Sequence, residues 1–320
     1  NIFYKNNENE VLFINKILNM KYYYDNKNLQ NKIISKNEIF NLPYSIELKK
    51  NVSEKKIFSK IFLNFLKLEI NNELDFNNKV KKGLVNFTLD KNKFNATYHI
   101  KENNFIFNLF DSLENFNFSY ESETSFSPFY SKLKGKIKEI NLFHLLNYNN
   151  LIPQLLKTEV LYNKNLNFDL NIYADKFKNF SDFIKIFLNL KIQEGLIDID
   201  NTKFYWKDDV YFFLEDSLIY VREGELILDG KLDITIKDPN EIYKFLQTPK
   251  NYRNELTNIK ANFTYNFDQK IINLSNILID DKSNQDVNKT LENLIFKKNH
   301  LQNRKYLKSI LNRALKFYAG

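Results

Sequence analysis

The sequence predicts a mainly β protein: a long twisted antiparallel sheet or meander that forms an open groove or a flattened barrel, with a few short helices and a C-terminal amphipathic helix. Apolar and polar side chains alternate with a period of two in one run after another, which is the pattern of a strand with one face in water. Turn-like pairs such as Lys82-Gly83 and Asp268-Gln269 separate these runs, as in successive hairpins.

The clearest strand lies between Gly224 and Asp238. One face carries Leu226, Leu228, Leu232, Ile234 and Ile236, and the other carries Glu225, Asp229, Lys231, Asp233, Thr235 and Lys237. Residues 94–101, 116–121, 166–173 and 259–267 show the same alternation. The apolar faces of these strands supply the candidate groove-lining residues, which are Phe94, Tyr98, Ile100, Phe116, Phe118, Leu166, Phe168, Leu170, Ile172, Leu226, Leu228, Leu232, Ile234, Ile236, Phe263 and Tyr265.

Shorter apolar runs predict further strands between these. They lie at residues 61–70, 84–89, 105–110, 133–140, 188–199, 210–214 and 218–221.

Few helices are predicted. Asp238 is a favourable cap and Pro239 a favourable first-turn residue, so a helix begins there and ends before Pro249. Residues 141–148 form a second candidate, and the last forty residues carry a helical apolar pattern that includes Val287, Leu291 and Leu315.

The C-terminal helix has two interpretations. Its polar side is basic, with Arg304, Lys305, Lys308, Arg313 and Lys316, which suits a membrane surface or a partner. The same charges also suit the solvated outer face of a cap that closes one end of the sheet, and this interpretation is favoured because most such charges are simply solvated.

No linker rich in proline, glycine or serine divides the chain, so residues 1–320 are expected to form a single elongated β-rich unit. Within it, residues 1–190 are N-terminal strands, residues 191–280 are C-terminal strands, and residues 281–320 are a helical cap.

Composition argues against several classes of protein. The chain has no cysteine, which excludes disulfides and thiolate metal sites. Its net charge is +8, but acidic and basic residues are interleaved and no basic arm is present, so nucleic-acid binding is not expected. No apolar run approaches the roughly 18 to 20 residues that a membrane-spanning helix needs.

No catalytic or metal-binding motif stands out. His99, His144 and His300 lie far apart and none has a second ligand at metal spacing. Asp198 and Asp200 lack the glycine and the closing glutamate of a calcium loop. The sequence therefore predicts a protein that is not an enzyme and that binds no metal or cofactor.

The apolar face itself is the remaining candidate site. Thirty phenylalanines and nineteen tyrosines supply a large aromatic surface. In one account the sheet folds over and buries this face as an ordinary core. In the other, the sheet stays open as a long hydrophobic groove for acyl chains. Residue patterns alone favour the ordinary core, because large exposed apolar patches are rare.

A family resemblance favours the groove. The segments that carry it are Gln193-Glu-Gly-Leu-Ile-Asp-Ile199, Asn201-Thr-Lys-Phe204, Val221-Arg-Glu-Gly-Glu-Leu-Ile-Leu-Asp-Gly-Lys-Leu232, the helix that begins at Asp238-Pro239, Phe245 to Pro249, and Leu274-Ser-Asn-Ile-Leu-Ile-Asp280. This pattern resembles the C-terminal region of AsmA-like proteins of Gram-negative bacteria, in their alphaproteobacterial form. It covers about the last 150 residues and extends weakly into the earlier strands.

The resemblance implies a non-enzymatic β-groove protein of the cell envelope that holds or conducts phospholipid acyl chains and contributes to outer-membrane lipid transport or assembly. It implies a periplasmic location, an inner-membrane anchor outside residues 1–320 and possible envelope protein partners. The alternative is a structural, scaffold or adhesin-like β protein of the envelope that binds no ligand.

Overall fold

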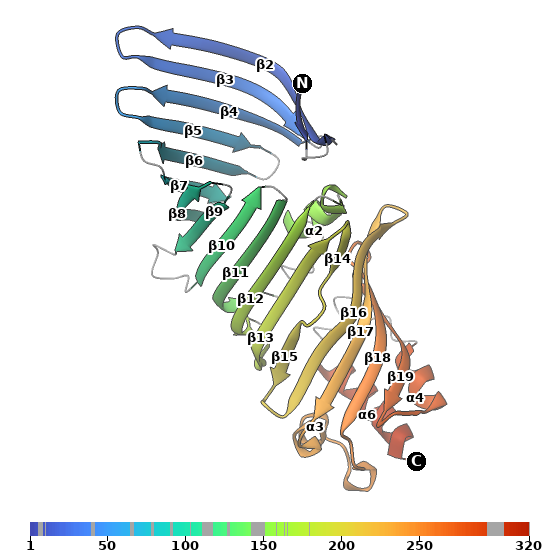
Figure 1. The fold of residues 1–320 in the computed structure, drawn as a ribbon. Coiled ribbons are helices and arrows are strands. Elements are labelled where there is room, and N and C mark those ends of the chain that lie inside the picture. Colours follow the sequence, from blue (N-terminus) through green and yellow to red (C-terminus); the bar gives the residue numbers. More distant parts are fainter. Residues whose placement is uncertain are drawn as a thin grey trace. The chain divides into compact units, whose positions relative to one another are not determined.

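A computed structural model describes residues 1–5, 9, 11–39, 42–64, 67–77, 80–89, 92–102, 104–110, 118–126, 129–141, 151–157, 159–162, 164, 166–178, 180–292 and 304–319. The predicted mainly β fold is confirmed: the described strands belong to one long sheet of 20 strands that does not close into a barrel, and helices are few (Figure 1). The sheet is mixed rather than wholly antiparallel as the sequence predicted, although the pairings from β1 to β11 and from β13 to β20 are all antiparallel.

The chain divides into two compact units. The N-terminal unit comprises Asn1–Ile137 and Asn163–Leu170, and the C-terminal unit comprises Lys138–Tyr162 and Asn171–Gly320. The division therefore passes through two strands, β11 (Phe129–Ile140) and β12 (Asn167–Phe177). It does not coincide with the boundaries expected at residues 190 and 280.

Strands are the only regular secondary structure among the described residues of the N-terminal unit. Besides its parts of β11 and β12, they are β1 (Ile2–Lys5), β2 (Val11–Asp25), β3 (Gln30–Ile39), β4 (Leu42–Asn51), β5 (Lys56–Leu63), β6 (Leu68–Asp75), β7 (Lys81–Leu89), β8 (Asn92–Lys101), β9 (Asn104–Phe110) and β10 (Phe118–Phe126). Each strand from β2 to β10 pairs with the next along the chain.

The register of these strands separates the side chains into a charged face and an apolar face. Ion pairs connect neighbouring strands on the charged face: Lys32 with Glu47 at 2.8 Å, and Lys60 with Glu69 at 2.8 Å. They contribute little energy because both partners are accessible to solvent. They do identify this face as the one that meets water.

Two glycines of the N-terminal unit sit beneath tyrosine rings of the neighbouring strand. Gly83 is opposite Tyr98, and Gly135 is opposite Tyr120. A Cβ atom at Gly83 would lie 2.1 Å from the ring of Tyr98, and one at Gly135 would lie 2.2 Å from the ring of Tyr120. The rings therefore lie flat along the sheet, where they cover the backbone that glycine leaves open.

The C-terminal unit contains the remaining strands and all the described helices. The strands are β13 (Phe180–Gln193), β14 (Leu196–Asp198), β15 (Lys203–Trp206), β16 (Val210–Arg222), β17 (Glu225–Ile236), β18 (Asn258–Asn266), β19 (Ile271–Ile279) and β20 (Lys282–Ser283). The helices are α2 (Leu151–Lys157), η1 (Val160–Tyr162), α3 (Pro239–Leu246), η2 (Lys250–Tyr252), α4 (Gln285–Glu292) and α6 (Arg304–Ala319).

Tight turns connect β13 to β14 and β16 to β17. The turn residues Glu223 and Gly224 have φ angles of 54° and 77°, and Glu194 and Gly195 have 55° and 82°. Two successive positive φ angles are typical of the two-residue hairpin turn whose twist matches that of the strands. The Glu-Gly pairs within the family-like segments thus have a direct role in turn geometry.

The predicted helix after Asp238 is confirmed as α3. The Asp238 carboxylate accepts a hydrogen bond from the Asn240 backbone N–H at 2.9 Å, and Pro239 occupies the first turn. The predicted helix at residues 141–148 lies outside the described residues, apart from Asn141, which is not in a helix.

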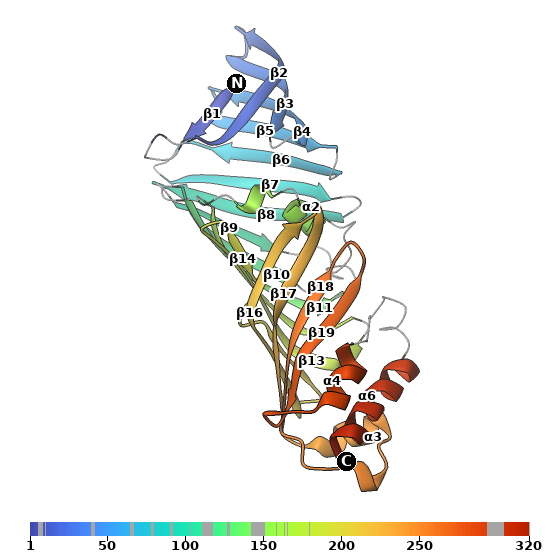
Figure 2. The ribbon, with the colours of Figure 1, turned by 90° about the vertical axis from the view of Figure 1, so that its right-hand side faces the viewer.

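Helices α3, α4 and α6 lie together against one end of the β-sheet in the C-terminal unit (Figure 2). Their buried side chains form one core with the strands, and this core contains Trp206, Val210, Ile236, Tyr243, Leu246, Leu256, Ala261, Ile277, Ile279, Val287, Leu291, Ala314 and Leu315. The C-terminal helical pattern therefore forms a cap. The basic residues Lys305, Arg313 and Lys316 are exposed on its outer side, whereas Lys308 is half-buried, with its ammonium group 4.3 Å from the centre of the Phe245 ring.

Specific hydrogen bonds hold α6 in place. The Tyr318 hydroxyl donates to the Asp280 carboxylate at 2.6 Å, and the Asn312 amide donates to the Leu246 carbonyl at 2.6 Å. The Asp280 carboxylate also accepts hydrogen bonds from the Thr257 hydroxyl and backbone N–H. Helix α6 is thus joined to the last residue of α3 and to the tip of the β19–β20 hairpin.

Gly135→Ala should destabilise the N-terminal unit, although alanine normally stabilises a strand relative to glycine. The new methyl group would collide with the Tyr120 ring, and we expect a loss of about 1–3 kcal/mol in the free energy of unfolding. Urea denaturation measures this loss. In a Tyr120→Ala background the same substitution should cost much less, and equal costs in both backgrounds would contradict the ring contact.

Alkaline pH should loosen the cap. Burial and the hydrogen bond to Asp280 raise the pKa of Tyr318 to about 12. The folded state therefore holds more protons than the unfolded state above pH about 10, and stability should fall as pH rises through about 12. Tyr318→Phe should make this decline shallower in denaturation experiments at a series of pH values. The matched variant Tyr173→Phe, at an exposed tyrosine of β12, should leave the decline unchanged.

Candidate functional site

The apolar face of the N-terminal unit is the candidate site. A line of directly paired residues crosses five adjacent strands on this face, and we call it the apolar row: Ile46, Ile61, Ile70, Phe87 and Phe94. The rings of Phe87 and Phe94 stack with their centroids 5.2 Å apart. All five side chains are half-buried rather than buried, and no described helix of the unit covers them.

Polar groups beside the apolar row satisfy one another. The Asn72 amide donates to the Ser59 hydroxyl at 3.1 Å, and the Tyr98 hydroxyl donates to the Asn72 carbonyl oxygen at 2.7 Å. Because these groups are already paired within the sheet, they do not impose the cost of unsatisfied polar atoms on an apolar ligand nearby.

The predicted lining residues of the N-terminal unit fall into four groups. Phe94 belongs to the apolar row, whereas Tyr98 is buried against Gly83. Ile100, Leu166, Phe168 and Leu170 are half-buried. Phe116 lies outside the described residues, and the side chain of Phe118 lies outside them as well, although its backbone belongs to β10.

Four members of the apolar row were missed by the sequence analysis: Ile46, Ile61, Ile70 and Phe87. The strand β5 shows why, because its sequence Lys-Ile-Phe-Ser-Lys-Ile-Phe-Leu has apolar residues on both faces. Phe58 and Phe62 point to the charged face and hide the alternation. Only the pairing with β4 and β6 shows which residues form the row.

The charged face of the same strands has a shallow hollow with a volume of about 260 Å³. It is lined by Phe58 and Leu84 together with charged and amide side chains such as Lys49, Lys60 and Glu73. Four charged side chains, Glu47, Lys49, Lys60 and Glu73, surround it, and an acyl chain bound there would have to desolvate them, so it is not the candidate lipid site.

In the C-terminal unit, the predicted lining residues divide along strand β17. Leu226 and Leu228 are buried at one end, with Tyr265 of β18 beside Leu228, and Ile236 is buried at the other end beneath the helical cap. Between them Leu232, Ile234 and Phe263 are only half-buried, and so is Ile172 in β12. A charge at Leu228 would therefore test the core rather than a groove.

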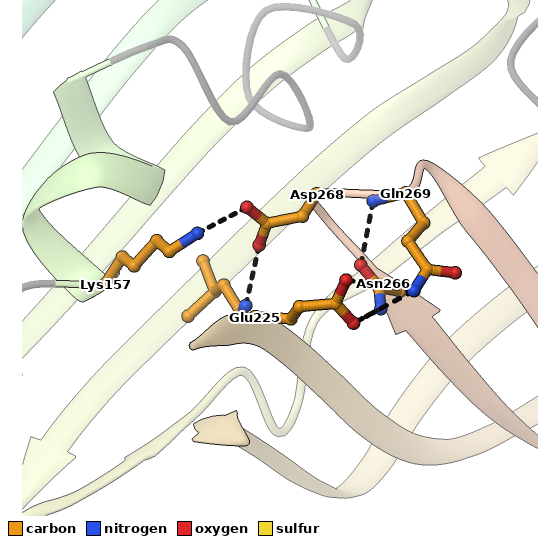
Figure 3. A network of polar contacts seen from close by, with 6 residues as sticks. Lys157, Glu225, Asn266, Asp268 and Gln269 are labelled. Carbon is orange, nitrogen blue, oxygen red and sulfur yellow. Dashed lines mark hydrogen bonds and ion pairs between the residues drawn. The ribbon is translucent and has the colours of Figure 1, made fainter. Parts of the chain in front are cut away.

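Helix α2 contacts strands β16 and β17 at the end where Leu226 and Leu228 are buried. A polar network joins it to two hairpins (Figure 3). The Lys157 ammonium group pairs with the Asp268 carboxylate, which also accepts a hydrogen bond from the Leu226 backbone N–H at 2.8 Å. Glu225 in turn accepts hydrogen bonds from the side chains of Asn266 and Gln269.

The electrostatics of this network favour the charged form of both acids. Burial raises the pKa of Asp268, but the hydrogen bonds from Lys157 and Leu226 outweigh it, so the pKa is lowered overall. Hydrogen bonds from Gln269 and Asn266 lower the pKa of Glu225. The network therefore holds α2 on the sheet at neutral pH.

The titratable residues considered for catalysis do not assemble into a reactive site. Asp200 accepts hydrogen bonds from the Ser217 backbone N–H and hydroxyl, at 2.7 and 2.6 Å. These bonds join the turn after β14 to the irregular part of β16, where the pairing with β17 shifts register. Among the described residues, no group of three or more histidine, aspartate or glutamate side chains could hold a metal ion. His99 lies in β8 on the charged face, and His144 and His300 lie outside the described residues.

In the part of the chain that the structure describes, no helix combines the length and apolarity that crossing a membrane requires. Comparisons with protein-family models, with curated proteins and with solved structures found no match to this chain.

Asp268→Asn should loosen the end of the sheet that α2 covers. The substitution removes the ion pair with Lys157 and weakens the acceptor for the Leu226 N–H, at an expected cost of about 1–3 kcal/mol in the free energy of unfolding. Limited proteolysis within residues 151–157 should accelerate. Asp216→Asn is the control, because it breaks an exposed ion pair with Lys231 and should cost less than about 1 kcal/mol.

Proposed function

We propose that this chain is a non-enzymatic protein of the cell envelope that holds or conducts phospholipid acyl chains on the apolar face of its β-sheet, and so contributes to outer-membrane lipid transport or assembly. The observation that carries the proposal is the apolar row. It crosses five strands of a unit whose described residues contain no helix to cover it. Large accessible apolar surfaces of this kind usually serve to bind a partner or ligand.

The mechanism is passive. An acyl chain that lies along the row removes its own methylenes and the five half-buried side chains from water. Each buried methylene contributes about 0.8 kcal/mol, so a few contacts across the row are sufficient for measurable affinity. The head group remains in water at the rim of the sheet. No bond is made or broken, so no catalytic residue is required.

The resemblance to AsmA-like proteins supports the envelope setting. It suggests a periplasmic chain with an inner-membrane anchor outside residues 1–320 and with envelope proteins as further partners. The distribution of charge is compatible with this setting, because interstrand ion pairs such as Lys32–Glu47 keep the opposite face of the sheet in water.

The second candidate is a structural or adhesin-like scaffold of the envelope that binds no ligand. The C-terminal unit favours it, because helices α3, α4 and α6 cover one end of its apolar face as an ordinary core. The two candidates differ in the fate of the apolar row: the lipid-binding function needs it accessible, and the scaffold function does not.

Two single-residue variants at adjacent positions of β5 test the lipid-binding function. Ile61→Glu places a charge in the apolar row, and Phe62→Glu places the same charge on the opposite face, where the Phe62 side chain is 39% exposed. We expect the first variant to stay folded and to lose lipid, because a carboxylate beside an acyl chain is costly to desolvate. The second variant should retain lipid.

Native mass spectrometry with lipid extraction measures lipid bound to the purified chain, and far-ultraviolet circular dichroism reports the fold. Phospholipid that co-purifies with the unmodified chain and with Phe62→Glu, but not with folded Ile61→Glu, would support the proposal. An unmodified chain that carries no lipid and takes none from liposomes would favour the scaffold. Unfolding of Ile61→Glu alone would place Ile61 in a packed core and would also count against the lipid row.

A further inference from the structure

Strand β2 has a long free edge. The short strand β1 pairs only with the first part of β2, from Val11 to Asn15. No described strand pairs with the outer edge of β2 from Lys16 to Asp25, whereas its inner edge pairs with β3 over the same length. The backbone N–H and C=O groups of an edge strand that point outward are a template for another strand.

The free edge lacks the usual protection against pairing. Residues 17–24 contain no proline and only one charged side chain, that of Lys21. Instead they expose large side chains: Met20 is 58% exposed, Tyr22 is 60% exposed and Tyr24 is 51% exposed. An edge of this length and apolarity is typical of strand addition by another polypeptide.

The register within β2 limits how another strand can pair. A bulge lies between Ile17 and Asn19, and the seven residues from Asn19 to Asp25 then pair with β3 without a break. In this stretch Met20, Tyr22 and Tyr24 lie on the apolar face with Ile33, while Asn19, Lys21, Tyr23 and Asp25 lie on the charged face. An added antiparallel strand must keep the same division between faces, because directly opposite residues share a face.

We propose that the free edge of β2 pairs with the same edge of a second copy of this chain, antiparallel and around a two-fold axis at Tyr22. In this register Asn19 faces Asp25 of the second copy, Met20 faces Tyr24 and Lys21 faces Tyr23. The pairs are amide with carboxylate, thioether with ring and cation with ring, each of which is favourable across strands. No like charges face each other.

The neighbouring registers are less favourable. Moving the axis to Lys21 places two lysines opposite each other, which is destabilising. Moving it to Tyr23 leaves only the five residues from Lys21 to Asp25 in unbroken pairing. The sequence of β2 is therefore self-complementary in one register, as an isologous two-fold interface requires.

The paired edge would join the apolar faces of the two N-terminal units into one surface, because Met20, Tyr22 and Tyr24 share a face with the apolar row. This assembly needs no lipid. Dimerisation and lipid binding can therefore fail independently of each other, and lipid-free protein tests the dimer alone.

A like-charge substitution at the axis tests the interface. Tyr22→Lys brings two lysines together and removes the contact between the two tyrosines, so we expect the dimer dissociation constant to rise by about tenfold or more. Sedimentation equilibrium on lipid-free protein measures it, with circular dichroism to confirm the fold. Tyr173→Lys, at a tyrosine of β12 that is 53% exposed, is the matched control and should dimerise like the unmodified chain.

Introduced cysteines test the register, because the chain has none of its own. Tyr22→Cys should form a disulfide-linked dimer under mild oxidation, since directly opposite residues in antiparallel strands are close enough for a disulfide. Met20→Cys and Tyr24→Cys should each cross-link poorly alone and well when the two variants are mixed.

A dimer that Tyr22→Lys weakens and Tyr173→Lys does not, together with this cross-linking pattern, supports the proposal. A chain that stays monomeric at all accessible concentrations overturns it. A dimer that Tyr22→Lys leaves unchanged, or cross-linking of Met20→Cys alone as readily as in the mixture, also overturns it, because the interface or the register would then lie elsewhere.

Discussion

The structure depends on one constraint: the interstrand hydrogen bonds of an antiparallel sheet place directly opposite residues on the same face. Once β4 pairs with β5 and β5 with β6, Ile46, Ile61 and Ile70 must lie in one line, and the partners Lys60 and Glu69 must meet on the other side. Every strand added in this way enlarges both faces together. A sheet that keeps adding strands therefore produces an apolar surface that something has to cover, and the two units meet this need differently.

The C-terminal unit covers the two ends of its apolar face with its own helices. The helices α3, α4 and α6 bury Ile236 and Ala261 at one end, and α2 contacts the end where Leu226 is buried. The hydrogen bond from Tyr318 to Asp280 holds α6 in position, and the ion pair between Lys157 and Asp268 holds α2. The N-terminal unit has only strands among its described residues, so its apolar row stays half-exposed. This contrast places the proposed lipid surface in the N-terminal unit and leaves the C-terminal unit as a more conventional packed structure.

Glycine and aromatic residues act together in both units. Gly83 and Gly135 accept the rings of Tyr98 and Tyr120, and Gly230 lies beneath Phe263 in the same manner, with a prospective Cβ atom 3.0 Å from the ring. These rings cover backbone instead of projecting from the sheet. Aromatic content alone is therefore a poor measure of how much apolar surface is available to a ligand. Tyr98 was expected to line the groove, and it instead packs on its own sheet and donates a hydrogen bond to Asn72.

The sequence by itself determined the fold class, the clearest strands and the start of α3, because alternation and capping are local properties of a few neighbouring residues. It also identified the apolar surface of the strands as the place to look for function. It could not assign the lining residues, since Leu228 and Leu232 occupy equivalent places in one alternating run, yet the first is buried and the second is half-buried. Only the tertiary structure decided this, because burial depends on which helix covers each part of the sheet. The apolar row likewise emerged from pairing between strands, and no single strand encodes it.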